Sequence, residues 1–383
     1  MTPITSKLPQ VGTTIFTTMS ALAAEVGAIN LSQGFPDYEC SPQLIELISK
    51  AMREGYNQYA PMAGYLPLRE AIAQKVENLY GAQYDPVTEI TITAGGTQAI
   101  FTAISAIVNP NDEVIIFEPA FDCYAPAIKV MGGVVKSLEL NPADYSIPWD
   151  MVKKLVSNRT RLIILNSPHN PTSTILHARD IAQLSEIVKN RDILILSDEV
   201  YEHLIYDGET HQSMARYPEL KERSFIVASF GKLFHATGWK VGYCLAPAYL
   251  MEEFRKVHQF LVFSVNTPMQ HAFAQYLRNE EVYTTLPEFF QEKRDYFRRG
   301  LAQTQFELLP CYGSYFQSVR YDKLTNESDV DFSLRLTKEA GVACIPTSAF
   351  YTNGTDLHTL RFCFAKKQET LDKALERLVA FKP

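Results

Sequence analysis

The chain has 383 residues, of which 46% are hydrophobic and 21% charged, a composition that excludes a disordered chain and allows a large core and two lobes. The net charge of −7 at pH 7 shows no basic excess, which argues against nucleic acid or an anionic membrane as a partner. No run reaches the roughly 18 apolar residues that cross a bilayer, and no basic-then-apolar segment opens the chain, so we expect neither export nor membrane insertion.

The first patterned segments are two amphipathic helices. Apolar residues recur at helical spacing after Ser41 and Pro42, and Gly55 follows that segment. A second such segment begins at Pro67 and is followed by Gly81. Because serine can cap a helix, proline suits its first turn and glycine suits the position beyond its last turn, both segments predict helices, the first one capped by Ser41.

Short apolar runs rich in β-branched residues follow, and helical patterns lie between several of them. The runs cover residues 90–93, 114–117, 162–165, 193–196, 225–228 and 241–245. Helical spacing is found over residues 99–108 and 181–188. Alternation of buried strands with helices predicts βαβ units and an α/β fold with a mainly parallel central sheet.

Beyond about residue 276 the pattern changes to longer helical segments around short strands. The expected helices cover residues 288–302, 331–340 and 370–381, and the strands lie near 313–319 and 360–364. This pattern of helices and short strands predicts a smaller α+β domain. We expect a large domain over residues 46–275, a small domain over 276–383, and an N-terminal arm over 1–45 that forms part of the small domain.

Chemically useful residues cluster just after the predicted strands, where ligands sit in α/β sheets. Gly95, Gly96 and Thr97 follow the first strand and precede a helix, a junction whose free N–H groups suit a phosphate. A tight turn explains these glycines equally well. No complete G-x-G-x-x-G motif is present, which disfavours a nicotinamide enzyme.

Three further strand ends carry side chains of interest. Phe121 follows the second strand and could offer its ring for stacking, or belong to the core. Asn170 lies in a proline-rich loop after the third strand, which has an equally good structural interpretation. Asp198 directly follows the fourth strand, with Tyr201 three residues later. A carboxylate there needs a cationic partner, such as a protonated heterocyclic nitrogen, unless it caps a helix.

The segment after the fifth strand places one hydroxyl and two lysines at fixed spacing. Ser229 and Lys232 are three residues apart, and Lys240 lies eight residues further. The nearby His235, like His169 after the third strand, has no pattern that marks it as catalytic. We therefore expect the two lysines to anchor a ligand at this strand end.

The cysteines are scattered through the chain and form no C-x-x-C motif. They are Cys40, Cys123, Cys244, Cys311, Cys344 and Cys363. Most lie in apolar surroundings, which favours reduced core thiols over disulfides or a zinc site. We expect a cytoplasmic protein with no metal ligands.

Several of these residues share their order and spacing with a known family. They are Asn170, Asp198, Tyr201, Ser229, Lys232, Lys240 and Arg361. In this set the chain resembles fold type I pyridoxal-phosphate enzymes, and more narrowly the class I/II aminotransferases. The resemblance runs from Asn30 to Phe364, and segments 33–37, 121–124 and 237–242 are similar to methionine and kynurenine/glutamine aminotransferases.

The resemblance implies pyridoxal 5'-phosphate as the cofactor and assigns a role to each matching residue. Lys232 would bind the cofactor covalently and carry the proton from the substrate α-carbon, with Lys240 helping to lower the pKa of Lys232. Asp198 would pair with the protonated ring nitrogen. The ring would be held by Asn170, Tyr201, Phe121 and Val200.

The same resemblance implies phosphate and substrate ligands. The phosphate would be bound by Gly95, Gly96, Thr97, Ser229 and Lys240, and by Tyr59 of a second subunit in a homodimer with shared sites. Arg361 would bind the substrate α-carboxylate, assisted by Asn170 and Gly34. Two positions depart from the relatives: Ser173 replaces a frequent glycine, and Phe16 replaces a tryptophan that kynurenine enzymes carry beside the substrate side chain.

The implied reaction is ping-pong transamination from methionine and other apolar or aromatic L-amino acids to a 2-oxo acid. A carbon–sulfur β-lyase on the same fold is an alternative, because it uses the same lysine. Ser229 and Lys232 also match the S-x-x-K of penicillin-recognising serine enzymes, although no S-D-N or K-T-G accompanies them. A non-catalytic sensor domain is a further alternative, for which a preceding basic DNA-binding segment would be expected.

Overall fold

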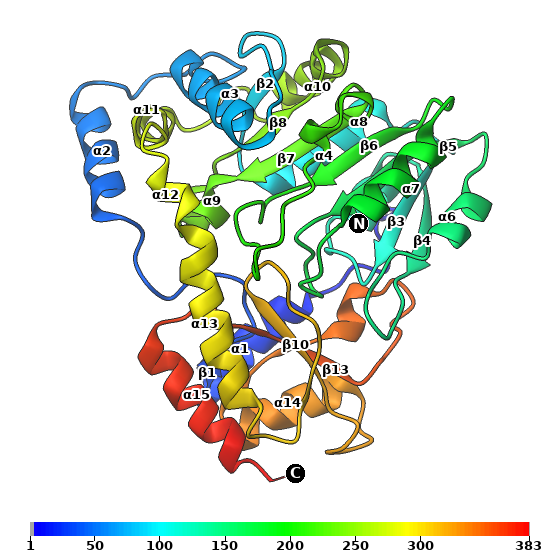
Figure 1. Cartoon of the computed structure of the whole chain (residues 1–383), viewed down its shortest axis with the longest axis vertical. Helices are drawn as coiled ribbons and strands as arrows, with labels where there is room; N and C mark the ends of the chain where they lie inside the picture. The colour runs from blue at the N-terminus through cyan, green and yellow to red at the C-terminus, as the bar shows by residue number, and fades with distance from the viewer. Residues whose placement is uncertain (1–3, 383) are drawn as a thin grey trace.

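The structure is a computed structural model that describes residues 4–382, and its centre is a seven-stranded sheet (Figure 1). The strand order is β2-β8-β7-β6-β5-β3-β4. The bounds are β2 Ile90–Thr93, β3 Glu113–Glu118, β4 Val134–Glu139, β5 Thr160–Asn166, β6 Leu194–Asp198, β7 Ser224–Ser229 and β8 Gly242–Leu245. Only the two pairings made by β8 are antiparallel. The expected α/β fold with a mainly parallel sheet is confirmed.

Helices cover both faces of this sheet (Figure 1). One face packs against α4 Gly96–Ile107, α5 Tyr124–Val130 and α10 Ala248–Leu261. The other packs against α3 Leu66–Tyr80, α7 Ala178–Val188 and α11 Thr267–Tyr276, and α2 Pro42–Arg53 packs on α11. Within β5, Leu162 and Ile164 point to the first face, whereas Ile163 and Leu165 point to the second. Burial on both faces explains why these strands are continuous apolar runs.

The C-terminal region forms a four-stranded antiparallel sheet in the order β12-β13-β10-β9. Its strands are β9 Glu307–Leu308, β10 Phe316–Arg320, β12 Ile345–Pro346 and β13 Thr359–Cys363. Its main helices are α13 Leu286–Leu301, α14 Asp329–Glu339 and α15 Gln368–Ala380. Short helices connect the two regions and the strands: α6 Trp149–Leu155, α8 Pro218–Lys221, α9 Phe230–Leu233 and α12 Glu281–Thr284.

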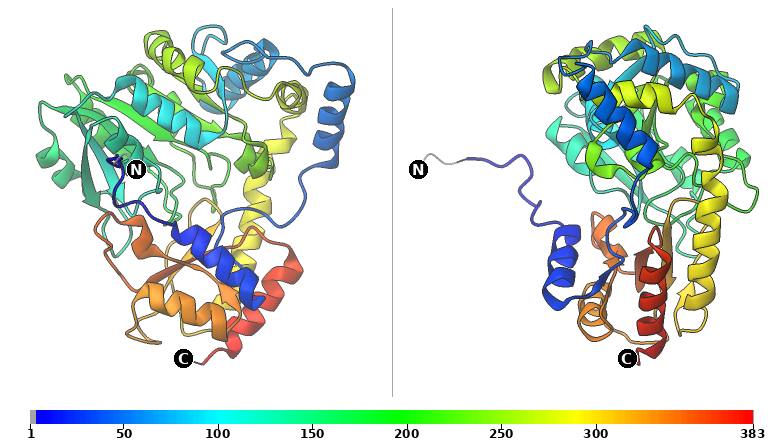
Figure 2. Two further views of the ribbon diagram at one scale, coloured as in Figure 1. Left: turned by 180° about the vertical axis from the view of Figure 1, so that it is seen from behind. Right: turned by 90° about the vertical axis from the view of Figure 1, so that its left-hand side faces the viewer.

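The N-terminal segment packs on the C-terminal region, as the views in Figure 2 show. Helix α1 Ile15–Val26 contacts α14, and β1 Ile29–Asn30 pairs in parallel with β11 Val342–Ala343. The chain then crosses to α2 and the large sheet. Because of this crossing, residues near both ends of the sequence reach the carboxyl edge of the central sheet.

Two local features differ from the sequence-based expectation. The edge strand β4 has no predicted counterpart, because its residues alternate between partial and full exposure and form no apolar run. Ser41 precedes α2, but its side chain makes no capping hydrogen bond, so Pro42 alone marks that helix start.

All six cysteines are free thiols, five of them buried, as expected. Among residues 4–382, no helix has both the length and the apolar character needed to cross a membrane.

Candidate active site

One cavity collects most of the predicted ligand-binding residues. It lies at the carboxyl ends of β5, β6 and β7 and at the N-terminus of α4. Its lining includes Gly95, Gly96, Thr97, Phe121, Asn170, Asp198, Val200, Tyr201, Ser229, Lys232 and Lys240. These residues come from five separate segments of the chain, and the parallel strands bring them together at one edge of the sheet.

Asp198 ends strand β6 with 2% of its surface exposed. Tyr124 donates a hydrogen bond from its hydroxyl to Asp198 Oδ2 at 2.6 Å, and Val200 N donates to Oδ1 at 3.3 Å. Burial raises the pKa of Asp198 to about 6. No helix follows directly, so the alternative of a helix N-cap does not apply. The buried Asp198 carboxylate can accept a further hydrogen bond, and a cationic ring nitrogen is a suitable donor.

Lys232 lies in the short helix α9, directly after strand β7. Its Nζ donates to the carbonyl of Gly34 at 2.9 Å and to the hydroxyl of Tyr315 at 2.8 Å. Burial lowers the pKa of Lys232 to about 8, and nearby Arg361 and Lys240 act in the same direction. Burial therefore lowers the pKa of Lys232 more than Lys240 does, whereas the sequence resemblance pointed to Lys240 as the cause. A lower pKa leaves more of the amine uncharged and nucleophilic at neutral pH.

The S-x-x-K interpretation finds no support in the contacts of Lys232. The Lys232 Nζ atom donates its two hydrogen bonds to Gly34 and Tyr315, and none to the hydroxyl of Ser229. A serine nucleophile activated by the lysine would need that direct contact. Ser229 instead lines the cavity beside the start of α4.

The start of α4 forms an anion cradle at one end of the cavity. Gly95 has φ +82° and is the N-cap, so the free N–H groups of the first helical turn open toward the cavity. A Cβ placed on Gly95 would lie 3.5 Å from Lys240 Nζ, and one on Gly96 would lie 3.0 Å from Val200 Cγ1. The helix N-terminus and the Lys240 ammonium together suit a phosphate.

Arg361 in β13 is a second cation near the cavity, with 1% of its surface exposed. It donates from Nη1 to Asn170 Oδ1 at 2.6 Å and from Nη2 to Ser32 O at 3.0 Å, while its buried Nε has no partner. The guanidinium stacks 3.9 Å from the centre of the Phe316 ring. Burial lowers the pKa of Arg361 to about 10, so it stays charged at neutral pH. A buried cation with an unpaired donor fits a carboxylate.

The other expected substrate-side residues lie close to Arg361. Gly34 accepts the hydrogen bond from Lys232, and a Cβ on Gly34 would come within 2.6 Å of Phe316. Phe16 is half-buried, packs edge-on against Phe350 at 5.7 Å, and lies 5.5 Å from the Arg361 guanidinium. Phe16 therefore contributes an aromatic wall beside the carboxylate-binding position.

Tyr59 does not join the cavity of its own chain. It is 82% exposed, and its ring contacts Phe263 edge-on at 5.3 Å. A role in the site is possible only if Tyr59 reaches the cavity of another subunit, which is the arrangement that the sequence resemblance implied.

The structure adds three residues that sequence reasoning did not assign. Tyr315 accepts from Lys232 and donates to the carbonyl of Gly34. Tyr124 hydrogen-bonds Asp198. Asn166 donates to Asp198 O at 2.9 Å and accepts from Asn170 N at 2.8 Å. No spacing in the sequence links these side chains to their partners, which lie from 4 to 281 residues away.

Taken together, the cavity fits a flat cationic ring that carries a phosphate and reacts with an amine. Asp198 would pair with the ring nitrogen, and the start of α4 would receive the phosphate. Lys232 supplies the amine between them. Arg361 offers a carboxylate site on the side that faces the C-terminal region. This donor set matches the pyridoxal phosphate that the sequence resemblance implied.

Comparisons with known proteins place the chain in one family. The profile "Aminotransferase class I and II" matches residues 26–378. A methionine aminotransferase of Escherichia coli is 51% identical over 97% of both chains, and a mouse kynurenine–oxoglutarate transaminase is 33% identical over 94% of this chain and 93% of its own length. The crystal structure of YbdL from Escherichia coli, described as a methionine aminotransferase, superposes with a TM-score of 0.96 at 49% identity, covering 99% of this chain and 100% of that one. The chain belongs to the class I and II aminotransferases.

Proposed function

We propose that this aminotransferase uses pyridoxal 5'-phosphate to move the α-amino group of methionine, and of other apolar or aromatic L-amino acids, to a 2-oxo acid. The observation that carries the proposal is the buried Lys232 amine, which shares one cavity with Asp198 and feels the charges of both Asp198 and Arg361. The preference for methionine is supported by the 51% identical relative of that name.

Pyridoxal phosphate, when bound, supplies an electron sink for the bond that breaks at the substrate α-carbon. Asp198 keeps a proton on the ring nitrogen, and Asn166 and Tyr124 hold Asp198 in position. The proposed ring contacts are Phe121 and Val200 on the faces and Tyr201 and Asn170 at the hydroxyl. The proposed phosphate ligands are Gly95, Gly96, Thr97, Ser229 and Lys240.

The substrate is bound and deprotonated by residues of two regions of the chain. Arg361 takes the α-carboxylate through its free Nε–H and a neighbouring N–H, while Asn170 fixes the plane of the guanidinium. The uncharged Lys232 amine would accept the proton from the substrate α-carbon and carry it to the cofactor carbon on the far side of the substrate nitrogen. Gly34 and Tyr315 hold that amine close to its working position.

Specificity and assembly are parts of the same proposal. Phe16 and Phe350 form an apolar aromatic wall near Arg361, which suits a thioether or an aromatic side chain. Tyr59 reaches the phosphate of a second subunit in a homodimer. The protein works in the cytoplasm, in keeping with its free thiols.

A half-reaction with methionine alone tests the proposal. The cofactor-loaded protein should lose its visible absorption band and release one equivalent of 2-oxo acid without thiol or ammonia, because transamination keeps the substrate carbon skeleton intact. Lys232→Ala should lower the rate of this half-reaction by at least about 10⁴-fold. Release of thiol would identify the carbon–sulfur lyase instead, and undiminished turnover of Lys232→Ala would exclude both reactions.

A further inference from the structure

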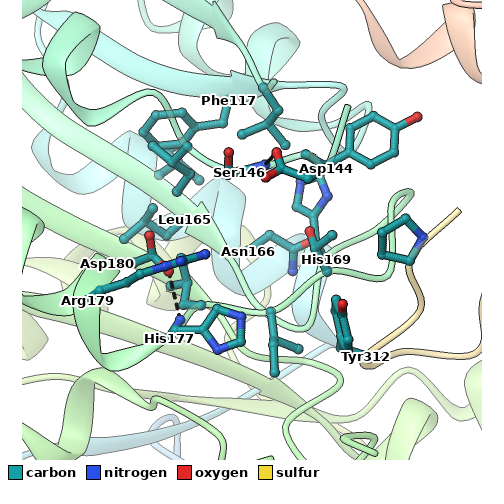
Figure 3. A pocket seen from close by; sticks show the side chains of 18 of the residues that line it. Phe117, Asp144, Ser146, Leu165, Asn166, His169, His177, Arg179, Asp180 and Tyr312 are labelled. Atoms are coloured by element: carbon teal, nitrogen blue, oxygen red, sulfur yellow. Dashed lines mark hydrogen bonds between the residues drawn. The ribbon is translucent and has the colours of Figure 1, made fainter. Parts of the chain in front are cut away.

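A second pocket, shown in Figure 3, adjoins the proposed cofactor cavity and shares Asn166 with it. Its volume is about 160 Å³, against about 180 Å³ for the cofactor cavity. In the close view, Asn166 and His169 lie near the centre, with Phe117 on one side and Tyr312 on the other. The pocket is therefore built from the ends of β3 and β5 together with a loop of the C-terminal region.

Two residues connect this pocket to the floor of the active site. Asn166 lines both cavities, and its carboxamide bonds Asp198 O and Asn170 N. Tyr124 lines the second pocket with its ring and donates its hydroxyl to Asp198 Oδ2 at 2.6 Å. Any molecule in this pocket would lie one side chain away from the Asp198 carboxyl.

The lining of the second pocket favours an apolar body. One side is formed by aromatic and aliphatic residues that belong to the core: Phe117, Leu140, Leu165 and Leu176. Trp149, which packs edge-on against Phe117 at 6.2 Å, extends this apolar layer. Apolar pockets of roughly 150 Å³ are large enough to hold a benzene ring.

The polar lining favours a ligand without charge. Asp180 accepts from Trp149 Nε1 at 2.9 Å and from His177 N at 2.8 Å, so both of its oxygens are paired. Burial lowers the pKa of His169 to about 4, which keeps the imidazole neutral. The remaining charged residues of the lining, Asp144 and Arg179, are exposed at the surface. No buried, unpaired charge faces the pocket in the described part of the chain.

We propose that this pocket is a second ligand site, which binds a neutral aromatic molecule of about the size of phenol and acts on catalysis through Tyr124. The ring packs against Phe117 and Leu165, and its polar group faces Asn166 and His169. Contact with Tyr124 shifts the hydroxyl of this residue and weakens the hydrogen bond that it donates to Asp198 Oδ2. A weaker hydrogen bond disfavours the charged form of Asp198 and so weakens its support of the ring nitrogen.

Titration calorimetry of the cofactor-loaded full-length protein with phenol tests the site. We expect a Kd between about 10 μM and 1 mM, the range that so few ligand atoms can provide. Ile147→Trp, which fills the pocket from a half-buried loop position, should raise that Kd at least about tenfold. Val379→Trp adds the same bulk on the exposed face of α15 and should leave the Kd unchanged. Ser146→Phe, also in the lining, serves as a second filling variant if Ile147→Trp fails to fold.

One control ligand and one kinetic measurement separate this site from the active site. Benzyltrimethylammonium, a ring with a permanent charge, should bind at least about tenfold more weakly than phenol. Phenol should also lower kcat by about threefold, the factor for half a pKa unit, without changing KM for methionine.

Three results of these experiments would count against the second ligand site. Absence of phenol binding would mean that the pocket holds only water, and unchanged binding in both filling variants would place phenol elsewhere. Binding only after removal of pyridoxal phosphate would place it in the cofactor cavity. Each result overturns the second site. Because calorimetry needs no turnover, failure of the proposed transamination would be seen separately.

Discussion

Lys232 is positioned by two oxygen atoms, the Gly34 carbonyl and the Tyr315 hydroxyl, and neither belongs to its own segment. Its amine is also enclosed by protein, which lowers its pKa to about 8. At the scale of single residues, the site therefore depends on burial and on two contacts that hold a reactive amine still.

Replacing Tyr315 tests the positioning of this amine. Tyr315→Phe removes the hydroxyl that accepts from Lys232 and leaves the ring in place, so we expect kcat to fall by about tenfold with little change in KM for methionine. Tyr321→Phe is a matched control, since Tyr321 is equally buried but donates to Glu327 O, and it should retain full kcat. Steady-state kinetics of both variants decide the point, and a fully active Tyr315→Phe would refute it.

The lowered pKa of Lys232 predicts the pH dependence of cofactor loading. Only the uncharged amine attacks an aldehyde, and a lowered pKa makes that form abundant at a lower pH. The rate at which cofactor-free protein takes up pyridoxal phosphate should rise with pH and reach half its maximum near pH 8. Stopped-flow absorbance measures this rate. A rise that is still incomplete above pH 10 would mean that burial does not perturb Lys232.

At the scale of elements, the N-terminus of α4 contributes two glycines whose lack of a side chain keeps the anion cradle open. Gly95 takes φ +82°, and Gly96 leaves room beside Val200. The apolar residues of α4 are buried in the core beside the sheet, so the cradle at its N-terminus has a rigid support.

Filling this cradle should weaken the cofactor site. Gly96→Val places a branched side chain 3.0 Å or less from Val200, so we expect the Kd for pyridoxal phosphate to rise by at least about tenfold. Gly12→Val has no neighbour within 4 Å and should bind the cofactor like the unchanged protein. Equilibrium dialysis gives both values. Equal affinities would show that the phosphate lies elsewhere.

At the scale of the whole molecule, the N-terminal segment returns to the C-terminal region through the β1–β11 pairing. We propose the domain division stated from the sequence, with residues 46–275 as the large domain and 276–383 plus part of 1–45 as the small domain. Gly34 and Arg361 reach Lys232 and Asn170 from the small-domain side. In this division, the proposed substrate site would be shared between the two domains.

The proposed dimer predicts complementation between two inactive variants. Lys232→Ala lacks the amine, and Tyr59→Ala lacks the residue that would serve the neighbouring subunit. In a mixed dimer, one site receives an intact Lys232 and an intact Tyr59, so unfolding and refolding the variants together should restore roughly a quarter of the original activity. If the mixture is no more active than the Tyr59→Ala protein alone, Tyr59 acts within its own chain or not at all.

Much of this arrangement could be predicted from local sequence. The strand at residues 90–93 has the predicted bounds, and five other predicted strands agree with β3, β5, β6, β7 and β8 to within two residues at each end. Buried parallel strands are continuous apolar runs, which is a strong local signal. Strand β4 lacks that signal because it is an exposed edge.

The sequence by itself determined the α/β fold, the strand ends at which Asp198, Ser229 and Lys232 lie, and through family resemblance the chemistry expected of them. Only the tertiary structure decided which side chains touch. Tyr315 reaches Lys232 across 83 residues, and Tyr124 reaches Asp198 across 74. Local patterns report backbone conformation and burial, whereas contacts of this kind and the pKa of Lys232 depend on packing between distant segments, which no local pattern encodes.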